Sequence, residues 1–426
     1  MNPTPEYTRR HSRWFEQIIL SYLFQFLLGI FVLISFSAIP IWGLEFWKLE
    51  DPNIFTSLIT CIISFLISTL ALRNLFRLPG SQSVGYVLPI TTICFVIPIV
   101  FILFFRTSYS IQVFIVSYIV TLIWCYMGFF IGKRYRIVRY ALLPFGEINE
   151  LDSAHGALFE VLKNPDIADQ RFNAILADFN NKKLTPEWEK FLAHCTLSRI
   201  PVYSIKRIRE SLLGRVKIDH LSENEFGSLL PSSSYEKIKR IIDLLTTILV
   251  IPILLPLFLI LAFCIRLESP GSILFIQERM GFRGKTFKMF KFRSMYIDKK
   301  GSGFTKEGSD PRITKIGNVI RKFRIDELPQ VFNILLGQMS FIGPRPESYE
   351  LSKWYEKDVP FFAYRHVVRP GLSGWAQVEQ GYAAEVDGMK IKLEYDFYYI
   401  KNFSFWLDLL ITFKTVKTIL TGFGAR

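Results

Sequence analysis

The stretch Leu244–Ile265, which reads LLTTILVIPILLPLFLILAFCI, contains 22 residues and no charged side chain. Its length is that of a bilayer-spanning helix, which needs about 20 apolar residues. Lys239 and Arg240 precede it, and Arg266 follows it. Because Lys and Arg favour the cytoplasmic side of a membrane, basic residues at both ends oppose a simple crossing.

Two prolines, Pro252 and Pro256, lie inside this stretch. Each removes a helical N–H and clashes with the carbonyl four residues back, and for Pro256 that carbonyl belongs to Pro252. We therefore expect a broken, re-entrant helix over residues 241–266, which enters one leaflet and returns to the same face. A kinked helix that spans the bilayer is the alternative.

Four more uncharged runs lie in the first 140 residues: Gln17–Leu44, Pro52–Leu72, Leu78–Phe105 and Thr107–Gly132. Each is long enough to span a bilayer. Buried helices of a soluble core are the alternative, but so short a segment cannot supply the shell that would cover them. We predict a four-helix transmembrane domain over residues 1–140. No Asp, Glu, Lys, Arg or His interrupts the runs, which argues against a transporter.

The basic residues around these runs predict their orientation. Arg and Lys gather at the N-terminus, after the second run and after the fourth, whereas the opposite loops hold only Lys48 and Arg106 beside three carboxylates. Both ends of the bundle are therefore expected to face the cytoplasm. The first run is longer than the core of about 7–15 residues in a cleaved signal peptide, so we expect it to remain as an anchor.

The composition agrees with a membrane protein that has an anionic partner. Of the 426 residues, 50% are hydrophobic and only 21% are charged, yet the net charge is +14. Nucleic acid is one partner for such a charge, but no nucleic-acid-binding fold or basic-aromatic pattern is recognisable, so we expect none. The five cysteines and five histidines have no metal-ligand spacing, and no disulfide framework or zinc site is expected.

Residues 141–234 have the composition of a soluble domain, and we predict that they form a small cytoplasmic α/β linker domain. Strands are expected at Arg171–Ala177 and Pro201–Ser204, and helices at Pro186–Cys195 and Ile205–Leu213. The segment has no glycine-rich nucleotide motif. We interpret it as a spacer or docking domain.

Residues 235–426 are predicted to form a C-terminal α/β domain, which becomes polar and basic after Arg266. Ser272–Arg279 and Lys285–Arg293 read as a strand hairpin around two glycines, with Lys291 and Arg293 on one face. Arg312–Arg324 reads as a helix, and a second apolar helix is expected at Val331–Leu336. Basic turns follow at Gly343-Pro344-Arg345-Pro346 and Arg369-Pro370-Gly371.

The adjacent carboxylates Asp326 and Glu327 lie between these two helices. If the pair is helical, neighbouring side chains diverge by about 100°, so one can attack a substrate while the other holds a metal. Carboxylates with open positions suit Mg²⁺, and arginine forks match phosphate oxygens. This combination indicates phosphoryl transfer through an aspartyl intermediate. The alternative is that Asp326 caps the following helix, with Pro329 in its first turn.

A series of ordered motifs runs from Lys239 to the C-terminus. They are Lys239-Arg240-x-x-Asp243, Gln277-x-Arg279-x-Gly281, Lys288-x-x-Lys291-Phe292-Arg293-Ser294-Met295, Arg312-Ile313-Thr314, Gly317-x-x-x-Arg321, Asp326-Glu327-Leu328-Pro329-Gln330, Asn333, Met339-Ser340-Phe341-Ile342-Gly343-Pro344-Arg345-Pro346 and Val368-Arg369-Pro370-Gly371-Leu372-Ser373-Gly374-Trp375-Ala376-Gln377-Val378. With them, about 190 residues resemble the catalytic unit of the bacterial sugar transferases, the monotopic phosphoglycosyl transferases. The N-terminal bundle and the join over Leu197–Ser232 resemble the long-chain branch of that family, which includes undecaprenyl-phosphate galactose and glucose phosphotransferases.

The resemblance implies a polyprenyl-phosphate hexose-1-phosphate transferase of the bacterial inner membrane, with its catalytic domain on the cytoplasmic face. It would transfer a sugar 1-phosphate from a nucleotide diphosphosugar, usually a UDP-sugar, to undecaprenyl phosphate, and so initiate assembly of a surface polysaccharide. Asp326 would attack the sugar-bearing phosphate and expel UMP, and Glu327 would hold Mg²⁺. The phosphate-binding residues would be Lys291, Arg293, Arg321, Arg345 and Arg369.

The sequence departs from the family pattern at two positions. Leu255 stands where the family has a serine before the proline of the re-entrant helix, and Pro252 is additional. Gln338 replaces a more usual acidic residue, so no metal role is assigned there.

Three questions stay open at this stage. The stretch Ser404–Thr421 has apolar residues at helical spacing, so it either lies in the headgroup plane or packs on the catalytic domain, and Trp354–Tyr364 is a second candidate for the headgroup plane. A non-catalytic membrane scaffold or regulator is the alternative function. The sugar is not determined, and self-association as a homo-oligomer is left open.

Overall fold

The computed structural model describes residues 7, 9–10, 13–44, 46, 51–81, 83–135, 137–145, 157–167, 170–179, 181, 183–217, 230–297, 310–380 and 386–421. The chain divides into two compact units, Met1–Gly214 and Arg215–Arg426. The three-domain division at residues 140 and 234 stays a prediction. Lys48 and part of the join after Leu197, residues 218–229, lie outside the described residues.

The first unit begins with apolar helices. They are α1 (Trp14–Leu20), α2 (Tyr22–Ser37), α3 (Ile39–Trp42), α4 (Pro52–Leu75), α5 (Val87–Phe104), which the short η2 (Val84–Tyr86) precedes, and α6 (Ile111–Tyr135). Among the described residues, five helices are long and apolar enough to cross a membrane: Tyr22–Trp42, Pro52–Leu75, Val84–Phe104, Ile111–Lys133 and Ser233–Glu268. These helices support a membrane protein, as the sequence predicts.

Helices α2, α4 and α6 pack closely inside the first unit. If Gly29 of α2 carried a Cβ atom, that atom would lie 2.3 Å from the Phe65 ring of α4 and 3.0 Å from the Trp124 ring of α6. Small residues allow membrane helices to approach this closely. Close packing matters in a membrane because the hydrophobic effect does not drive helices together in lipid. Phe65 is fully buried in the resulting apolar core.

A parallel sheet of four strands completes the first unit. Its order is β2 (Ala157–Val161), β1 (Val138–Leu142), β3 (Ala174–Ala177) and β4 (Val202–Ser204). Helix α7 (Pro186–Leu197) packs against one set of core residues and α8 (Ile205–Leu213) against another. The predicted strands at β3 and β4 and the two helices are confirmed, whereas β1 and β2 are additional.

The second unit contains α9 (Ser233–Glu268), the antiparallel hairpin β5 (Leu274–Met280) and β6 (Thr286–Phe292), and a series of shorter elements. The latter are η5 (Phe282–Gly284), α10 (Lys315–Lys322), η6 (Ile325–Glu327), α11 (Gln330–Leu335), β7 (Ser340–Ile342), α12 (Tyr349–Asp358), η7 (Phe362–Val367), β8 (Gly371–Ser373), α13 (Trp375–Glu379), α14 (Val386–Lys401) and α15 (Phe405–Thr421). The predicted hairpin is confirmed. Helix α10 is shorter than the predicted Arg312–Arg324, because Thr314 caps its N-terminus and Arg324 is left-handed.

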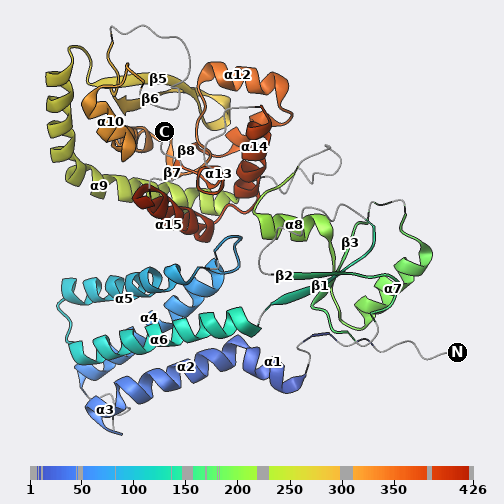
Figure 1. Cartoon of the computed structure of the whole chain (residues 1–426). Coiled ribbons are helices and arrows are strands. Elements are labelled where there is room, and N and C mark those ends of the chain that lie inside the picture. Colours follow the sequence, from blue (N-terminus) through green and yellow to red (C-terminus); the bar gives the residue numbers. More distant parts are fainter. Residues whose placement is uncertain are drawn as a thin grey trace. The chain divides into compact units, whose positions relative to one another are not determined.

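Helix α9 runs through Pro252 and Pro256 without interruption, and Figure 1 shows it bent between two arms. The expectation of a broken helix is corrected to a bent one, since a kink absorbs the lost hydrogen bond and the clash at proline. Straight, a helix of 36 residues would be about 54 Å long.

Both ends of α9 are attached to the same unit. Near its start, Arg240 donates to the carbonyls of Ile334 and Leu335 at 2.6 and 3.0 Å. At its end, Glu268 accepts the backbone N–H of Lys315 at 2.6 Å. Between these ends the helix exposes large apolar side chains, which include Leu249, Ile253, Leu259 and Phe263.

The two basic turns of the sequence lie against each other. β7 and β8 are parallel neighbours, and a side-chain carbon at Gly371 would lie 2.1 Å from the backbone nitrogen of Gly343. Only glycine permits this approach of two chains. The turn that carries Arg345 therefore rests directly on the one that carries Arg369.

Helix α15 packs on the rest of the second unit, which confirms one of the two interpretations of Ser404–Thr421. Leu407, Leu410 and Ile411 are fully buried. Asp408 is also buried and accepts hydrogen bonds from three side chains, those of Tyr235, Lys239 and Tyr399. A membrane-surface role for Trp354–Tyr364 stays a prediction.

Candidate active site

Asp326 and Glu327 lie in the single 3-10 turn η6, between α10 and α11. Arg324, with a left-handed φ of 54°, directs the chain out of α10. Pro329 is the N-cap residue of α11, and no side chain caps that helix. The interpretation of Asp326 as a helix cap is therefore wrong. Successive residues of a 3-10 turn are about 120° apart, so the two carboxylates point in different directions.

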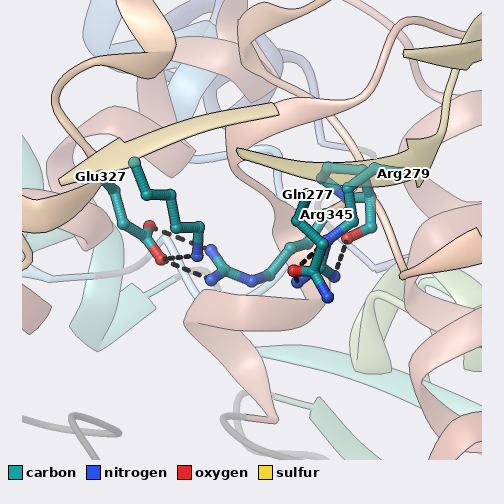
Figure 2. A network of polar contacts seen from close by, with 6 residues as sticks. Gln277, Arg279, Glu327 and Arg345 are labelled. Carbon is teal, nitrogen blue, oxygen red and sulfur yellow. Dashed lines mark hydrogen bonds and ion pairs between the residues drawn. The ribbon is translucent and has the colours of Figure 1, made fainter. Parts of the chain in front are cut away.

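Glu327 is buried and holds two cations (Figure 2). The guanidinium of Arg345 donates to its two oxygens at 2.5 and 3.1 Å, and Lys291 Nζ donates to Oε1 at 3.1 Å. Burial raises the pKa of Glu327, but Arg345 and Lys291 outweigh it and hold the pKa well below its usual range. Glu327 is therefore ionised, and it fixes the positions of a lysine from β6 and an arginine from the turn after β7.

Asp326 differs from its neighbour. Among the residues that the structure describes, none donates a hydrogen bond to its carboxylate. Burial and the charge of Glu327 raise its pKa to about 6, against the opposing effect of Lys291, Arg321 and Arg345. A carboxylate without a donor and with a raised pKa is more basic, and so more nucleophilic, than an ordinary one, yet it is still mostly ionised at pH 7.

Two further polar residues extend this cluster along β5. Arg279 donates to the Gln277 side chain at 2.6 and 3.1 Å and to the Pro346 carbonyl at 3.0 Å. Figure 2 shows Arg345 between Glu327 on one side and Gln277 with Arg279 on the other. Their i, i+2 spacing places Gln277 and Arg279 on one face of a strand, which is the signal that sequence reasoning had available and did not use.

Three buried charged residues behind the Arg345 turn were also missed: Glu347, Arg365 and Asp396. Arg365 forms an ion pair with Asp396 at 2.8 Å and lies 3.6 Å from Glu347. These charged side chains are buried by segments far apart in the sequence, so no local sequence pattern predicts their burial.

Of the five predicted phosphate-binding residues, Lys291, Arg321 and Arg345 act electrostatically on Asp326. The other two, Arg293 and Arg369, are engaged elsewhere. Arg293 is buried and donates to the carbonyls of Ser269 and Pro270, directly after α9, at 2.6 and 2.7 Å.

Arg369 lies in a different polar cluster. It donates to Glu236 of α9 at 2.8 Å and to the Gly337 carbonyl at 3.2 Å, and it stacks over the Phe282 ring. The sequence suggested phosphate binding because both Arg293 and Arg369 are basic and lie near turns, but their fixed partners are a carbonyl pair and a carboxylate.

A metal site can be tested against the same residues. Among the described residues, no group of three or more His, Cys, Asp or Glu side chains is arranged to hold a metal ion. Mg²⁺ is commonly held by only one or two carboxylates and completed by substrate phosphates. The donor chemistry of Asp326 with Glu327 fits such an ion, although three N–H groups already contact the Glu327 oxygens.

Comparison with known proteins gives two kinds of similarity. The family described as "Bacterial sugar transferase" matches residues 234–422. Over 422 residues, 99% of this chain and 100% of the relative, the sequence is 48% identical to a UDP-N-acetylgalactosamine-undecaprenyl-phosphate N-acetylgalactosaminephosphotransferase of Aeromonas hydrophila.

Other relatives match less than half of this chain. An undecaprenyl-phosphate glucose phosphotransferase of Komagataeibacter xylinus is 40% identical over 195 residues, which are 44% of this chain and 37% of that protein. A UDP-glucose:undecaprenyl-phosphate glucose-1-phosphate transferase of Escherichia coli (strain K12) is 38% identical over 183 residues, 42% of this chain and 39% of the relative. Residues 234–422, which the family model matches, contain Lys291, Asp326, Glu327 and Arg345.

Proposed function

The chain belongs to the bacterial sugar transferase family, and we propose that it transfers a sugar 1-phosphate from a UDP-sugar to undecaprenyl phosphate. The product would start the assembly of a surface polysaccharide or glycoconjugate on its lipid carrier. One observation carries the catalytic proposal: Asp326 is an ionisable carboxylate without a hydrogen-bond donor among the described residues, and cations surround it.

In the first step, a carboxylate oxygen of Asp326 attacks the sugar-bearing phosphorus of the donor. A phosphorus–oxygen bond forms, the bond to the bridging oxygen of the diphosphate breaks, and UMP leaves with that electron pair. The product is a phosphosugar ester of Asp326. The raised pKa of Asp326 supports this role, because a more basic carboxylate is a better nucleophile. The carboxylate also does not have to give up a hydrogen bond before it attacks.

In the second step, a phosphate oxygen of undecaprenyl phosphate attacks the same phosphorus. The aspartyl ester bond breaks, the Asp326 carboxylate is restored, and an undecaprenyl diphosphosugar leaves. Both steps pass through a phosphoryl group whose oxygens carry negative charge. The enzyme's contribution is therefore mostly position and electrostatics.

We assign the phosphate oxygens to Lys291, Arg321 and Arg345, the three cations that act on Asp326. Glu327 fixes Lys291 and Arg345 before the substrate arrives, so they need little reorganisation. A planar guanidinium such as that of Arg345 matches two phosphate oxygens at once. Arg293 and Arg369 are not part of this assignment, because their partners are elsewhere.

Mg²⁺ is proposed as the cofactor, held by Glu327 beside Asp326 and completed by donor phosphates. When bound, a divalent cation neutralises negative charge on a diphosphate. Glu327 would have to share its oxygens with Arg345 and Lys291 in that state.

The membrane arrangement follows from α9. We propose that α9 is re-entrant and that the catalytic domain lies on the cytoplasmic face of the inner membrane. Support comes from the attachment of both ends of α9 to one unit, which a straight membrane-crossing helix would not permit, and from its exposed apolar bend. The basic residues beside the N-terminal runs favour the cytoplasmic side.

The test uses the full chain in lipid nanodiscs with undecaprenyl phosphate, Mg²⁺ and a panel of labelled UDP-sugars. The panel includes UDP-N-acetylgalactosamine and UDP-glucose, because relatives are named for these donors. We expect released UMP and an organic-soluble sugar, and, without the lipid acceptor, a phosphosugar adduct on the peptide that contains Asp326. If no donor yields UMP, the enzymatic proposal is wrong.

Asp326→Asn should abolish both UMP release and the adduct, whereas Asp358→Asn, an exposed carboxylate of α12, serves as the control. Equal turnover by Asp326→Asn would refute the nucleophile. A scaffold or regulator without turnover would instead give no UMP with any variant.

A further inference from the structure

The turn that carries Arg345 has few backbone donors of its own, because Pro344 and Pro346 lack an N–H group. Besides the bond from Gly343 N to the Ser373 carbonyl at 2.8 Å, the segment is held through the carbonyls of residues 344–347, each of which accepts one hydrogen bond from another part of the chain. The contacts are Gly371 N to Pro344 O at 3.0 Å, Arg365 Nη2 to Arg345 O at 2.9 Å, Arg279 Nη1 to Pro346 O at 3.0 Å and Met280 N to Glu347 O at 3.1 Å. The position of Arg345 thus depends on groups outside the turn.

Arg365 is the group that holds the carbonyl of Arg345 itself, and Asp396 in turn holds Arg365. Two nitrogens of the Arg365 guanidinium, Nε and Nη2, contact Asp396 Oδ2 at 3.1 and 2.8 Å, and Nη2 also donates to the Arg345 carbonyl. Arg365 and Asp396 are 2% and 1% exposed, so no water competes for these contacts. The chain of contacts runs from α14 through η7 to the backbone of Arg345.

A second carboxylate competes for the same guanidinium. Glu347 lies 3.6 Å from Arg365 Nη1 and also accepts a hydrogen bond from Lys392 of α14. Without the charge of Asp396, the attraction of Glu347 for Arg365 would be unopposed. The guanidinium would then be drawn away from the Arg345 carbonyl.

We infer that Asp396 and Arg365 are positioning residues, which act through the Arg345 backbone to place the Arg345 guanidinium on Glu327 and on the donor phosphates. Among the contacts of the described residues, neither Arg365 nor Asp396 reaches Asp326, Glu327 or the Arg345 guanidinium, and Arg365 meets Arg345 only at its backbone carbonyl. The part of this inference that concerns phosphates rests on the proposed function. The part that concerns the turn does not, and the experiments separate the two.

The first experiment measures amide hydrogen exchange of Met280 and Gly371, the two backbone donors to the turn, in the full chain in nanodiscs. Asp396→Asn keeps the size of the side chain and removes its charge. We expect exchange at both amides to become about tenfold faster, because the turn loses one of its carbonyl contacts.

The matched control is Asp408→Asn, which removes another buried carboxylate with side-chain donors of its own, on α15. It should leave both amides within about twofold of wild type. Arg365→Lys keeps a positive charge but loses the fork that reaches Asp396 and the Arg345 carbonyl together, so it should resemble Asp396→Asn. Equal exchange in the Asp396→Asn and Asp408→Asn proteins would overturn the inference.

The second experiment is a double-mutant cycle with Arg345→Lys. The readouts are the dissociation constant of UDP, by equilibrium dialysis, and kcat/KM of UMP release. Alone, Asp396→Asn should raise the dissociation constant of UDP and lower kcat/KM of UMP release, each by about ten- to a hundredfold, as a small misplacement of a substrate-binding group does. In the Arg345→Lys background it should cost less than about twofold, because the group that it positions is already lost.

Factors that multiply in the double variant would refute positioning through Arg345, while turnover by the wild type would leave the proposed function intact. If the wild type neither binds UDP nor releases UMP, the proposed function fails. The exchange experiment then decides the inference about the turn by itself.

Discussion

Lowering the pH from 7 to 5 should slow UMP release about tenfold, because it protonates Asp326. With a pKa of about 6, the ionised fraction of this carboxylate falls from about nine-tenths at pH 7 to about one-tenth at pH 5. At an ordinary aspartate pKa of about 3.9, the same change would remove less than about a tenth of the ionised form. The two cases are easily distinguished.

The surroundings of Asp326 also predict how the acid limb moves. Burial is the largest cause of the raised pKa, Glu327 adds to it, and Lys291, Arg321 and Arg345 oppose it. Arg321→Gln removes one opposing charge, so the limb should move to higher pH. Arg321→Lys retains the charge and is the matched control, in which the limb should stay near that of wild type.

The assay is a single-turnover measurement of UMP release in nanodiscs without the lipid acceptor, from pH 4.5 to pH 8. Two other buried groups near the site, His366 and Glu347, titrate below this window. Burial and Arg365 lower the pKa of His366 to about 3, and that of Glu347 is about 2, since Lys392 and Arg365 outweigh its burial. A rate constant that is unchanged between pH 7 and pH 5, with circular dichroism showing a folded protein, would refute the account of Asp326.

Further predictions concern stability and the membrane helix. Asp326→Asn should raise the Tm at pH 7, because a carboxylate whose pKa is raised to about 6 destabilises the folded state above that pH by about 2–3 kcal/mol. This gain in Tm should shrink as the pH falls through 6 and vanish near pH 4. A lower Tm of the variant at pH 7 would contradict the prediction. Glu327→Gln should cost about 3–5 kcal/mol at pH 7, because it leaves two buried cations without their carboxylate. Its effect should diminish in acid, where the depressed pKa no longer contributes stability, and a Tm equal to that of wild type at pH 7 would count against the pairing. Arg293→Ala should lower the Tm but change KM for the UDP-sugar by less than about twofold, because the hydrogen bonds of Arg293 hold the segment directly after α9. A tenfold higher KM would show that Arg293 binds a phosphate of the donor after all. Pro252→Leu combined with Pro256→Leu should straighten α9, so that cysteines placed at its two ends become labelled from opposite sides of the membrane; same-side labelling would show that the prolines do not cause the bend.

Local features of the fold could be predicted from the sequence because their causes are local. An uncharged run of more than 20 residues, a strand hairpin around two glycines and a helix at apolar spacing each depend on neighbouring residues. The strands β1 and β2 escaped prediction for the opposite reason. β1 (Val138–Leu142) follows directly on the basic end of α6 and contains Arg139, so it reads as a membrane flank until its parallel partners are known.

The candidate site likewise has features that the sequence predicts and features that depend on the tertiary structure. The sequence by itself determined that Asp326 and Glu327 are adjacent, that basic residues lie on both sides of them in the chain, and that two prolines interrupt the apolar run of α9, although it predicted a break where the structure has a bend. Only the tertiary structure decided which cation serves which anion: Arg345 contacts Glu327, whereas Arg293 contacts two carbonyls after α9. A side chain's partner is chosen by segments that meet in space, and burial makes that choice energetically strong, because an unpaired charge away from water is costly. For the same reason, the different pKa values of two neighbouring carboxylates are properties of the fold and cannot be read from their order in the chain.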